Sequence, residues 1–318
     1  MTADMSTFAN ACRACGLIGF SLLMVWTTGC DDDVTASGQL EQVWGRRGTS
    51  DGRLQKPRAM AVDAQDNIYI VDMSARIQVF DADGNLRRGP WQMPAFANGK
   101  PTGISIDRDG NLAVADTHYY RVLFFSPEGE LLEQKTIGGT AGHGPGQFGL
   151  VTDVVQDSQG NYYVSEYGEF DRIQKFSRDG EFIMQWGGHG DQPGQFRRPQ
   201  NLAIDDQDQI WVCDACNHRI QVFDTQGQLL QIWGQHGRQL GQLAYPYDLV
   251  LDQQFVYICE FGNNRVQKFT RDGQPVACWG TSGRREGQLH NPWALVRNRA
   301  GQLLVLDTNN HRVQKIRL

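Results

Sequence analysis

One five-residue pattern occurs six times in this chain at a nearly constant interval. Each copy begins with Arg and continues with an apolar residue, and the copies start at Arg76, Arg121, Arg172, Arg219, Arg265 and Arg312. The interval between successive copies is 45 to 51 residues. A period of this length indicates a repeated supersecondary unit that packs against its own copies, because one unit alone cannot bury its apolar faces. The repeat therefore constrains the fold strongly and the activity much less.

Each repeat contains four short apolar runs separated by turn-forming residues. In the fourth copy the runs span residues 199–205, 210–214, 219–223 and 228–233. Runs of this length between turns indicate β-strands, and none of them has the 3.6-residue period of a helix. Each copy therefore predicts a meander of four antiparallel strands. The leading position of the copies holds Pro57, Pro101, Val151, Pro199, Pro246 and Pro292.

Six meanders in succession predict the architecture. Meanders with a period of 40 to 50 residues are typical of β-propellers. We therefore predict an all-β fold, a six-bladed β-propeller of four-stranded antiparallel blades, over residues 39–318. The last copy stops at Leu318 after its third strand, whereas residues 40–45 match the fourth-strand residues 230–234. We expect this N-terminal strand to complete the last blade and close the ring, which leaves no open sheet edge.

Three recurring motifs resemble those of NHL repeats. They are a Pro followed six residues later by Asp, an Asp-x-x-Asn-x-Arg-(Ile/Val)-Gln hairpin, and a Trp-Gly…Gly-Gln-Phe linker between copies. The resemblance extends over residues 40–318, although the linker after Trp91 departs from it. It implies a propeller in a family that includes RNA-binding domains and zinc-dependent amidating lyases.

An acid ends the second strand of every copy, four to six residues before the repeat Arg. We expect a charge-assisted ion pair at the base of each hairpin. A contact repeated in every copy favours a structural role, because a ligand site ordinarily combines unlike residues. The six acids are Asp72, Asp116, Glu166, Asp214, Glu260 and Asp307.

Residues that differ between copies are better candidates for a ligand site, because rigid scaffolds carry function in their loops. Directly after the leading position stand Arg58, Tyr247 and Trp293, on the first, fifth and sixth blades. These blades adjoin across the predicted closure, and an Arg with two aromatic residues is typical of a recognition patch. Ordinary packing of the loops is the alternative. His218 and His311, beside the repeat Arg, complete the ligand-binding candidates.

Asp153, Asn201 and Asp248 occupy one equivalent position in three consecutive copies. Their oxygens are candidate ligands for Ca²⁺ at the channel mouth, where lactonase-type propellers, which this fold resembles, use calcium. Capping of local turns is the alternative. The amidating lyases of the family hold zinc through His directly after the leading proline, and no His stands there in this chain. We therefore expect no catalytic residue and no cofactor, with calcium or zinc as the alternative.

The first 30 residues differ from the repeats. An apolar run at residues 17–26 follows Arg13, and Thr27-Thr28-Gly29-Cys30 comes next. The run is shorter than the roughly 20 residues of a transmembrane helix and indicates a secretion signal. Gly29-Cys30 resembles the end of a bacterial lipobox. We expect a signal peptide at residues 1–29, lipidation of Cys30 and a tether at residues 30–38, with an ordinary signal peptide as the alternative.

Four cysteines lie within the repeats. Cys213 and Cys216 have the spacing of a redox or zinc pair, but no second pair accompanies them. We expect Cys213, Cys216, Cys259 and Cys278 to be buried free thiols.

The charge of the chain restricts the class of partner that it can bind. The net charge is -6, and Lys and Arg are dispersed among acids along the chain. Nucleic-acid-binding domains cluster their basic residues, so we expect no nucleic-acid partner. We predict an extracytoplasmic monomer, a bacterial lipoprotein that is periplasmic or on the cell surface and meets the membrane through its lipid anchor only. Its loops are predicted to form a binding scaffold for a protein, peptide or glycan. The alternative is a metal-dependent lyase or lactonase-type hydrolase at the channel mouth.

Overall fold

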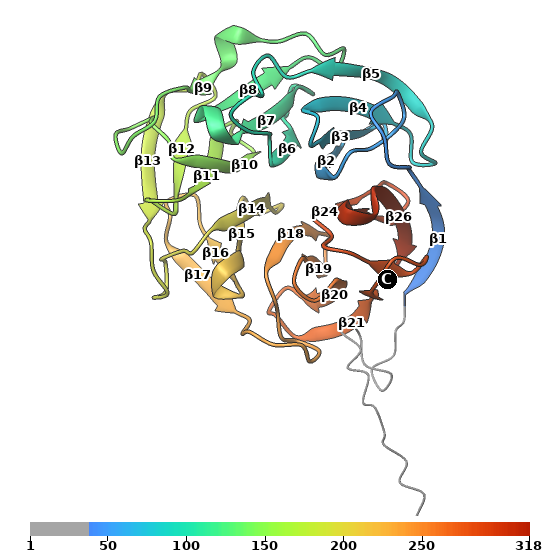
Figure 1. The fold of residues 1–318 in the computed structure, drawn as a ribbon. Helices are drawn as coiled ribbons and strands as arrows, with labels where there is room; N and C mark the ends of the chain where they lie inside the picture. The colour runs from blue at the N-terminus through green and yellow to red at the C-terminus, as the bar shows by residue number, and fades with distance from the viewer. Residues whose placement is uncertain (1–37) are drawn as a thin grey trace, which may run out of the picture.

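The computed structural model describes residues 38–318, which form a ring of six four-stranded sheets around a central axis (Figure 1). All six sheets are antiparallel. In five of them the strands run in chain order from the inside of the ring to the rim, and in the sixth the outermost strand is the N-terminal one. The prediction of a six-bladed all-β propeller is confirmed.

The first three blades follow one another along the chain. Blade 1 contains β2 (Pro57–Val62), β3 (Ile68–Asp72), β4 (Arg76–Phe80) and β5 (Leu86–Gln92). Blade 2 contains β6 (Gly103–Ile106), β7 (Leu112–Asp116), β8 (Arg121–Phe125) and β9 (Ile137–Gly138). Blade 3 contains β10 (Leu150–Gln156), β11 (Tyr162–Tyr167), β12 (Arg172–Phe176) and β13 (Phe182–Gly187).

The other three blades complete the ring. Blade 4 contains β14 (Pro199–Ile204), β15 (Ile210–Asp214), β16 (Arg219–Phe223) and β17 (Leu229–Trp233). Blade 5 contains β18 (Pro246–Leu251), β19 (Phe255–Glu260), β20 (Arg265–Thr270) and β21 (Pro275–Trp279). Blade 6 contains β24 (Ala294–Arg297), β25 (Leu303–Asp307), β26 (Arg312–Arg317) and β1 (Gln39–Trp44).

Short elements lie in the connections. The strands β22 (Thr281–Ser282) and β23 (Gln288–Leu289) pair in parallel within the linker before blade 6. Four short 3-10 helices are η1 (Thr117–Tyr119), η2 (Glu133–Lys135), η3 (Ala215–Asn217) and η4 (Thr308–Asn310).

The N-terminal strand closes the ring, as the sequence predicts. β1 pairs antiparallel with β26, from Gln39 opposite Arg317 to Trp44 opposite Val313. The Trp44 ring reaches across to the next blade, where its centroid lies 5.2 Å from that of Phe80. Blade 6 is therefore completed by the start of the propeller, and its outer strand also contacts blade 1.

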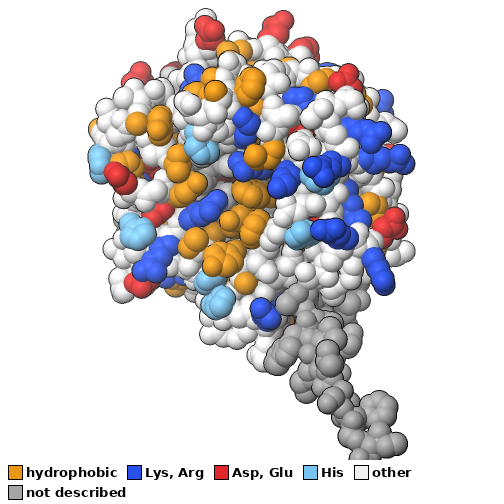
Figure 2. Space-filling model, in the orientation of Figure 1, with side chains coloured by type: hydrophobic (Ala, Val, Ile, Leu, Met, Phe, Trp, Pro, Cys, Tyr) orange, Lys and Arg blue, Asp and Glu red, His pale blue; other side chains and the backbone are white. Residues whose placement is uncertain are grey.

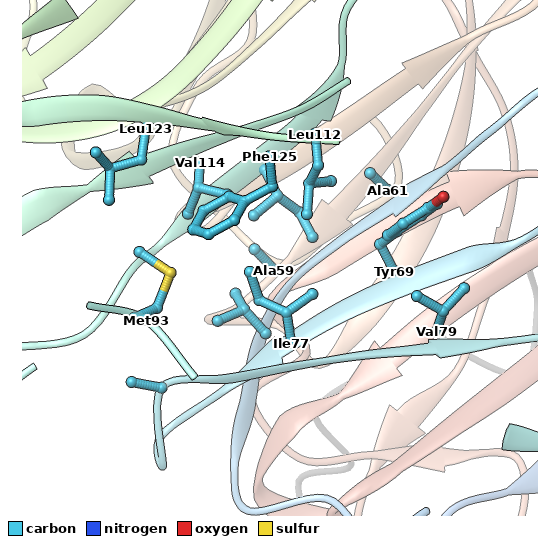
Figure 3. Close-up of a cluster of buried hydrophobic side chains, with 13 residues drawn as sticks. Ala59, Ala61, Tyr69, Ile77, Val79, Met93, Leu112, Val114, Leu123 and Phe125 are labelled. Carbon is cyan, nitrogen blue, oxygen red and sulfur yellow. The ribbon is translucent and has the colours of Figure 1, made fainter. Parts of the chain in front are cut away.

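Apolar side chains fill the space between neighbouring sheets. Figure 3 shows the cluster between blades 1 and 2, where Ile77, Val114 and Phe125 pack near Met93. Met93 is 1% exposed and belongs to the linker that lacks the Gly-Gln-Phe motif. Each of the other linkers buries a large apolar residue, namely Leu54, Phe148, Phe196, Leu243 and Leu289.

The predicted acid–arginine pair is present in all six blades, at nitrogen–oxygen distances of 2.6 to 2.9 Å. Blade 4 illustrates its role. Arg219 donates through Nε to Asp214, and through Nη2 to the carbonyls of Gln192 and Gln195 in the linker. Asp214 in turn accepts the backbone N–H of Arg197. The pair therefore holds the linker on its blade, and the interpretation of it as a structural contact is confirmed.

The predicted signal peptide, the tether at residues 30–37 and Cys30 lie outside the described residues, so these expectations stay predictions. Among residues 38–318, no helix has the length and apolar character needed to cross a membrane.

Candidate functional site

The loop face is the face on which the linkers and the loops between second and third strands emerge. At its centre is a hollow of about 20 Å³ at the mouth of the channel. Its lining includes five residues that directly follow a leading proline, namely Arg58, Thr102, Gln200, Tyr247 and Trp293. Figure 2 shows one face of the molecule, on which basic side chains border a central strip of apolar side chains.

Backbone geometry directs several of these side chains. In blades 1, 4 and 5 the strand register shifts at the start of the inner strand, between Pro57 and Ala59, Pro199 and Asn201, and Pro246 and Asp248. The extra residues in these β-bulges are Arg58, Gln200 and Tyr247. A bulge turns one side chain away from the regular alternation of a strand. The residue directly after the leading proline therefore occupies a β-bulge in these blades, and its side chain lines the hollow.

Four aromatic and basic side chains form one cluster beside the hollow. Tyr247 stacks on Phe261 with centroids 4.4 Å apart, and Trp293 meets Tyr247 edge-on at 5.1 Å. The guanidinium of Arg58 lies 5.3 Å from the centroid of Trp293. The structure thus brings Arg58, Tyr247 and Trp293 together across the ring closure, as the sequence led us to expect.

A second arginine joins this cluster. The guanidinium of Arg198 lies 4.7 Å from the ring centroid of Tyr167 and 5.4 Å from that of Tyr247. Its Nε donates to the side-chain oxygen of Gln200 at 2.9 Å. Sequence reasoning missed Arg198 because it stands directly before the leading proline, one position outside the set of residues we compared.

Arg58 differs from the six repeat arginines in its electrostatics. Each repeat arginine has a carboxylate partner, whereas no ion pair or hydrogen bond within the described residues engages the Arg58 guanidinium. Burial lowers the pKa of Arg58, and the positive charge of Arg198 lowers it further. An arginine nevertheless keeps its proton in proteins. The mouth of the hollow therefore carries two positive charges with no carboxylate of the described residues bound to them.

The predicted metal ligands Asp153, Asn201 and Asp248 line the floor of the hollow. Each accepts a backbone N–H from the inner strand of the following blade, so they clasp neighbouring blades rather than their own turns. The donors are Leu202 to Asp153 at 3.0 Å, Leu249 to Asn201 at 3.3 Å and Leu295 to Asp248 at 2.7 Å.

The floor carboxylates are unusually easy to protonate. Burial raises the pKa of Asp153 to about 7, and burial raises the pKa of Asp248 well above its usual range. Asp153 Oδ1 has no hydrogen-bond partner within the described part of the chain, and it lies against Gly103. A Cβ at Gly103 would approach this oxygen to 2.6 Å, so only glycine allows the two inner strands to lie this close.

These three side chains do not present a calcium cage as arranged. Ca²⁺ takes six to eight oxygen ligands, but one oxygen of each residue is directed at the next strand, and Asn201 Nδ2 donates to Asp153 at 2.9 Å. The calcium site therefore stays a prediction.

The lining does not fit zinc either. Zn²⁺ prefers imidazole, thiolate and carboxylate ligands, whereas Arg, Thr, Gln, Tyr and Trp occupy the positions after the leading prolines and the lining contains no His or Cys. In residues 38–318, no group of three or more His, Cys, Asp or Glu is placed to hold a metal ion.

The candidates His218 and His311 lie outside the lining of the hollow. His218 Nδ1 accepts the N–H of Tyr245 at 3.1 Å, and His311 Nδ1 accepts the N–H of Lys56 at 2.9 Å. Asp171 and Asn264 form the same contact from equivalent positions in blades 3 and 5. Both histidines are therefore interblade clasps, a role that recurrence across four blades supports.

The cysteine expectation is partly wrong. Cys213 and Cys259 are buried free thiols, as expected, and burial raises the pKa of both well above the usual range. Cys216 is exposed rather than buried, because it lies in the loop after β15. Cys278 is 1% exposed and therefore buried, as expected.

Comparison with known proteins identifies the repeat. The NHL repeat model matches residues 196–223 and 289–316, which lie in blades 4 and 6. Peptidyl-glycine alpha-amidating monooxygenase B of Xenopus laevis is 39% identical over 128 residues. Peptidylglycine alpha-amidating monooxygenase of Rattus norvegicus is 40% identical over 130 residues. Each alignment covers 37% of this chain and 13 to 14% of the relative, so the chain spans a small part of these proteins.

Solved structures share the architecture. A streptogramin B lyase superposes with a TM-score of 0.61 at 13% identity, covering 88% of this chain and 98% of the other. A catalytically inactive virginiamycin B lyase from Staphylococcus aureus with quinupristin gives 0.59 at 12% identity, covering 88% and 99%. Likeness at this identity shows the fold alone. With the six blades, the ring closure and the matched repeats in place, the chain is a six-bladed β-propeller with NHL repeats in blades 4 and 6.

Proposed function

We propose that the propeller is a recognition scaffold whose hollow binds the C-terminal end of a peptide. The terminal carboxylate contacts Arg58 and Arg198, and the preceding side chain packs on Tyr247, Phe261 and Trp293. The observation that carries the proposal is the Arg58 guanidinium, which is half-buried over Trp293 and has no carboxylate partner within residues 38–318.

The chemistry of the hollow supports a carboxylate. A guanidinium offers a planar fork of donors that matches the two oxygens of a carboxylate, and a partly desolvated site strengthens that bond. Aromatic residues that are already packed lose little freedom on binding and serve well as anchors. The hollow has a volume of about 20 Å³, far below the range of drug-sized pockets, which favours a small group such as the carboxylate at the end of a chain over a large ligand.

The relatives support the same ligand class. Their names refer to peptidylglycine, which is a peptide with a C-terminal glycine and therefore a free terminal carboxylate. A peptide of this class supplies the anion that Arg58 lacks. Because the chain spans only a small part of these relatives, the proposal covers recognition and not their complete reaction.

The test compares two peptides that differ only at the terminus. Isothermal titration calorimetry of residues 38–318 with Ac-Ala-Ala-Phe-Gly as free acid and as C-terminal amide should give at least tenfold tighter binding of the acid. Arg58→Gln should abolish this preference. Arg108→Gln, in an exposed turn on the opposite face, is the matched control and should keep it. Equal affinity for acid and amide would exclude the carboxylate site.

A lyase at the same hollow is the second candidate. Its support is the pair of floor carboxylates, since a pKa of about 7 for Asp153 suits a group that exchanges a proton near neutral pH. The lining does not fit zinc, so we derive no metal-dependent step. Mass spectrometry of the same peptide ending in α-hydroxyglycine tests this candidate, because breaking its N–Cα bond gives the peptide amide and glyoxylate without an oxidant. An amide product that disappears in Asp153→Asn would favour the lyase, and an unchanged peptide would exclude it for this substrate.

We also propose that the propeller acts outside the cytoplasm, as a monomer held at a membrane by a lipid on Cys30. The apolar run before Gly29-Cys30 supports this location.

A further inference from the structure

Exposed charge is distributed unevenly between the two faces of the propeller. On the loop face, the exposed basic residues are Arg46, Arg47, Arg53, Lys56, Arg197, Arg238, Arg284 and Arg285. The exposed acids on the same face are Asp51, Glu169, Asp191 and Glu286. A chain with a net charge of -6 therefore carries an excess of positive charge on the face that holds the hollow.

The opposite face balances this excess with acids. Turns between first and second strands, and between third and fourth strands, expose Asp83, Asp109, Glu128, Glu130, Asp179, Glu181, Asp206 and Asp272. Along the sequence the two signs alternate, because each repeat visits both faces. Exposed basic residues also lie outside the loop face, among them Arg108, Arg178 and Arg299, but the acids in these turns outnumber them. The expected absence of a nucleic-acid partner stays a prediction.

The basic residues are also concentrated on one side of the hollow. Six of them, which we call the basic arc, lie on the two linkers that flank blade 6, at residues 45–56 and 280–292. The arc consists of Arg46, Arg47, Arg53, Lys56, Arg284 and Arg285. None of the six forms an ion pair within the described residues. By contrast, the linker at residues 138–149 contains no Lys or Arg.

We propose that the basic arc docks the acidic residues of the peptide whose C-terminal end lies in the hollow. This inference rests on the proposed function and adds the direction and the charge of the ligand. The arc adjoins Arg58 on blade 1 and Trp293 on blade 6, so a chain that leaves the hollow over blade 6 passes along unpaired cations. Its carboxylates gain Coulomb attraction there at little cost in desolvation, because the arc is exposed.

The position of the arc favours a peptide over a flat anionic surface. A lipid bilayer would contact the loop face all round its rim, but the linker at residues 138–149 offers it no Lys or Arg. A peptide leaves the hollow in one direction only and needs cations on that side alone. The charge also affects the rate, because a field of one sign around a site speeds the encounter with an oppositely charged ligand.

The test adds an acidic segment to the peptide used for the proposed function. Ac-Glu-Asp-Glu-Ala-Phe-Gly and Ac-Gln-Asn-Gln-Ala-Phe-Gly, both free acids, are titrated into residues 38–318 at 20 and 300 mM NaCl. We expect roughly tenfold tighter binding of the acidic peptide at low salt, as three exposed ion pairs of ordinary strength provide. This preference should shrink at high salt.

A quadruple variant locates the effect. Arg46→Gln, Arg47→Gln, Arg284→Gln and Arg285→Gln together should remove the preference for the acidic peptide and leave the neutral peptide unchanged. A charge-matched control replaces Arg87, Arg88, Arg108 and Arg178, which are exposed outside the loop face, and should keep the preference.

The outcomes separate the two proposals. Equal affinity for both peptides would overturn the basic arc and leave the carboxylate site intact. Failure of both peptides to bind would remove the proposed function and the arc with it. If instead the quadruple variant loses binding to vesicles of phosphatidylglycerol and phosphatidylethanolamine while both peptides bind equally, the arc is a membrane surface and the peptide proposal is wrong.

Discussion

The closure of the ring by β1 can be tested with one substitution and an internal control. Trp44 of β1 is 8% exposed, and its ring lies 5.2 Å from Phe80 of the next blade at an interplanar angle of 36°. Trp233 makes the equivalent contact with Phe269 at 5.1 Å and 41°, but its strand is continuous with its own blade. The two tryptophans therefore share one ring geometry, although Trp233 is only partly buried, and they differ in whether the chain must close the ring.

The expected cost follows from this burial. Truncating a buried Trp to Ala removes its apolar contacts and leaves a cavity, at about 3 to 5 kcal/mol. If β1 is an integral part of blade 6, Trp44→Ala should lower the free energy of unfolding by about this amount. For a domain of this size the midpoint temperature should fall by roughly 6 to 12 °C. Trp233→Ala should also destabilise the protein, by a somewhat smaller amount because Trp233 is only partly buried.

The assay is urea and thermal unfolding followed by far-UV circular dichroism, which does not depend on tryptophan emission. A closed ring unfolds as one unit, so Trp44→Ala should shift the whole transition and add no separate early step. A change below about 0.5 kcal/mol for Trp44→Ala, beside the expected loss for Trp233→Ala, would refute the closure of the ring through this strand.

Arg265→Met should lower the free energy of unfolding by about 3 to 5 kcal/mol, because it leaves Glu260 buried without its partner at 2.6 Å. Arg121→Met should cost less, because the Arg121 side chain is 25% exposed. Equal losses of the two variants in chemical denaturation would contradict this reasoning. Burial lowers the pKa of His218 and His311 below the ordinary value of about 6.5. Their contribution to the free energy of unfolding is therefore fully present above about pH 6.5 and is lost as the pH falls through the lowered pKa, because the unfolded chain binds protons more readily. Replacing both histidines by Asn, which makes the same clasp at residue 264, should flatten the fall in midpoint temperature between pH 7 and 5, and an unchanged slope would remove the histidines as its cause. Cys30→Ser should release the full-length protein from membranes on fractionation, and unchanged partition would count against lipidation.

The sequence by itself determined the repeat and almost all of the architecture. The period, the alternating apolar strands and the Trp44 match specify blades and closure, because each strand must hide one face and each edge needs a partner. The equivalence of copies also indicated that the acid–arginine pair is structural. Likewise, once the ring is expected to close, the sequence predicts that Arg58, Tyr247 and Trp293 are neighbours, because each follows the leading proline of an adjoining blade.

Only the tertiary structure decided which residues act together. From the sequence, His218 and His311 are plausible ligand-binding residues. In the structure each has a left-handed backbone conformation directly before the repeat Arg, and its ring accepts a backbone N–H from the linker to the next blade. Arg198 joins the aromatic cluster from a position that no motif marked, and Met93 replaces a missing linker motif through packing alone. The excess of charge on each face arises in the same way. A propeller repeat returns to both faces every few residues, so signs that alternate along the chain separate in space, and no average over the sequence can reveal it.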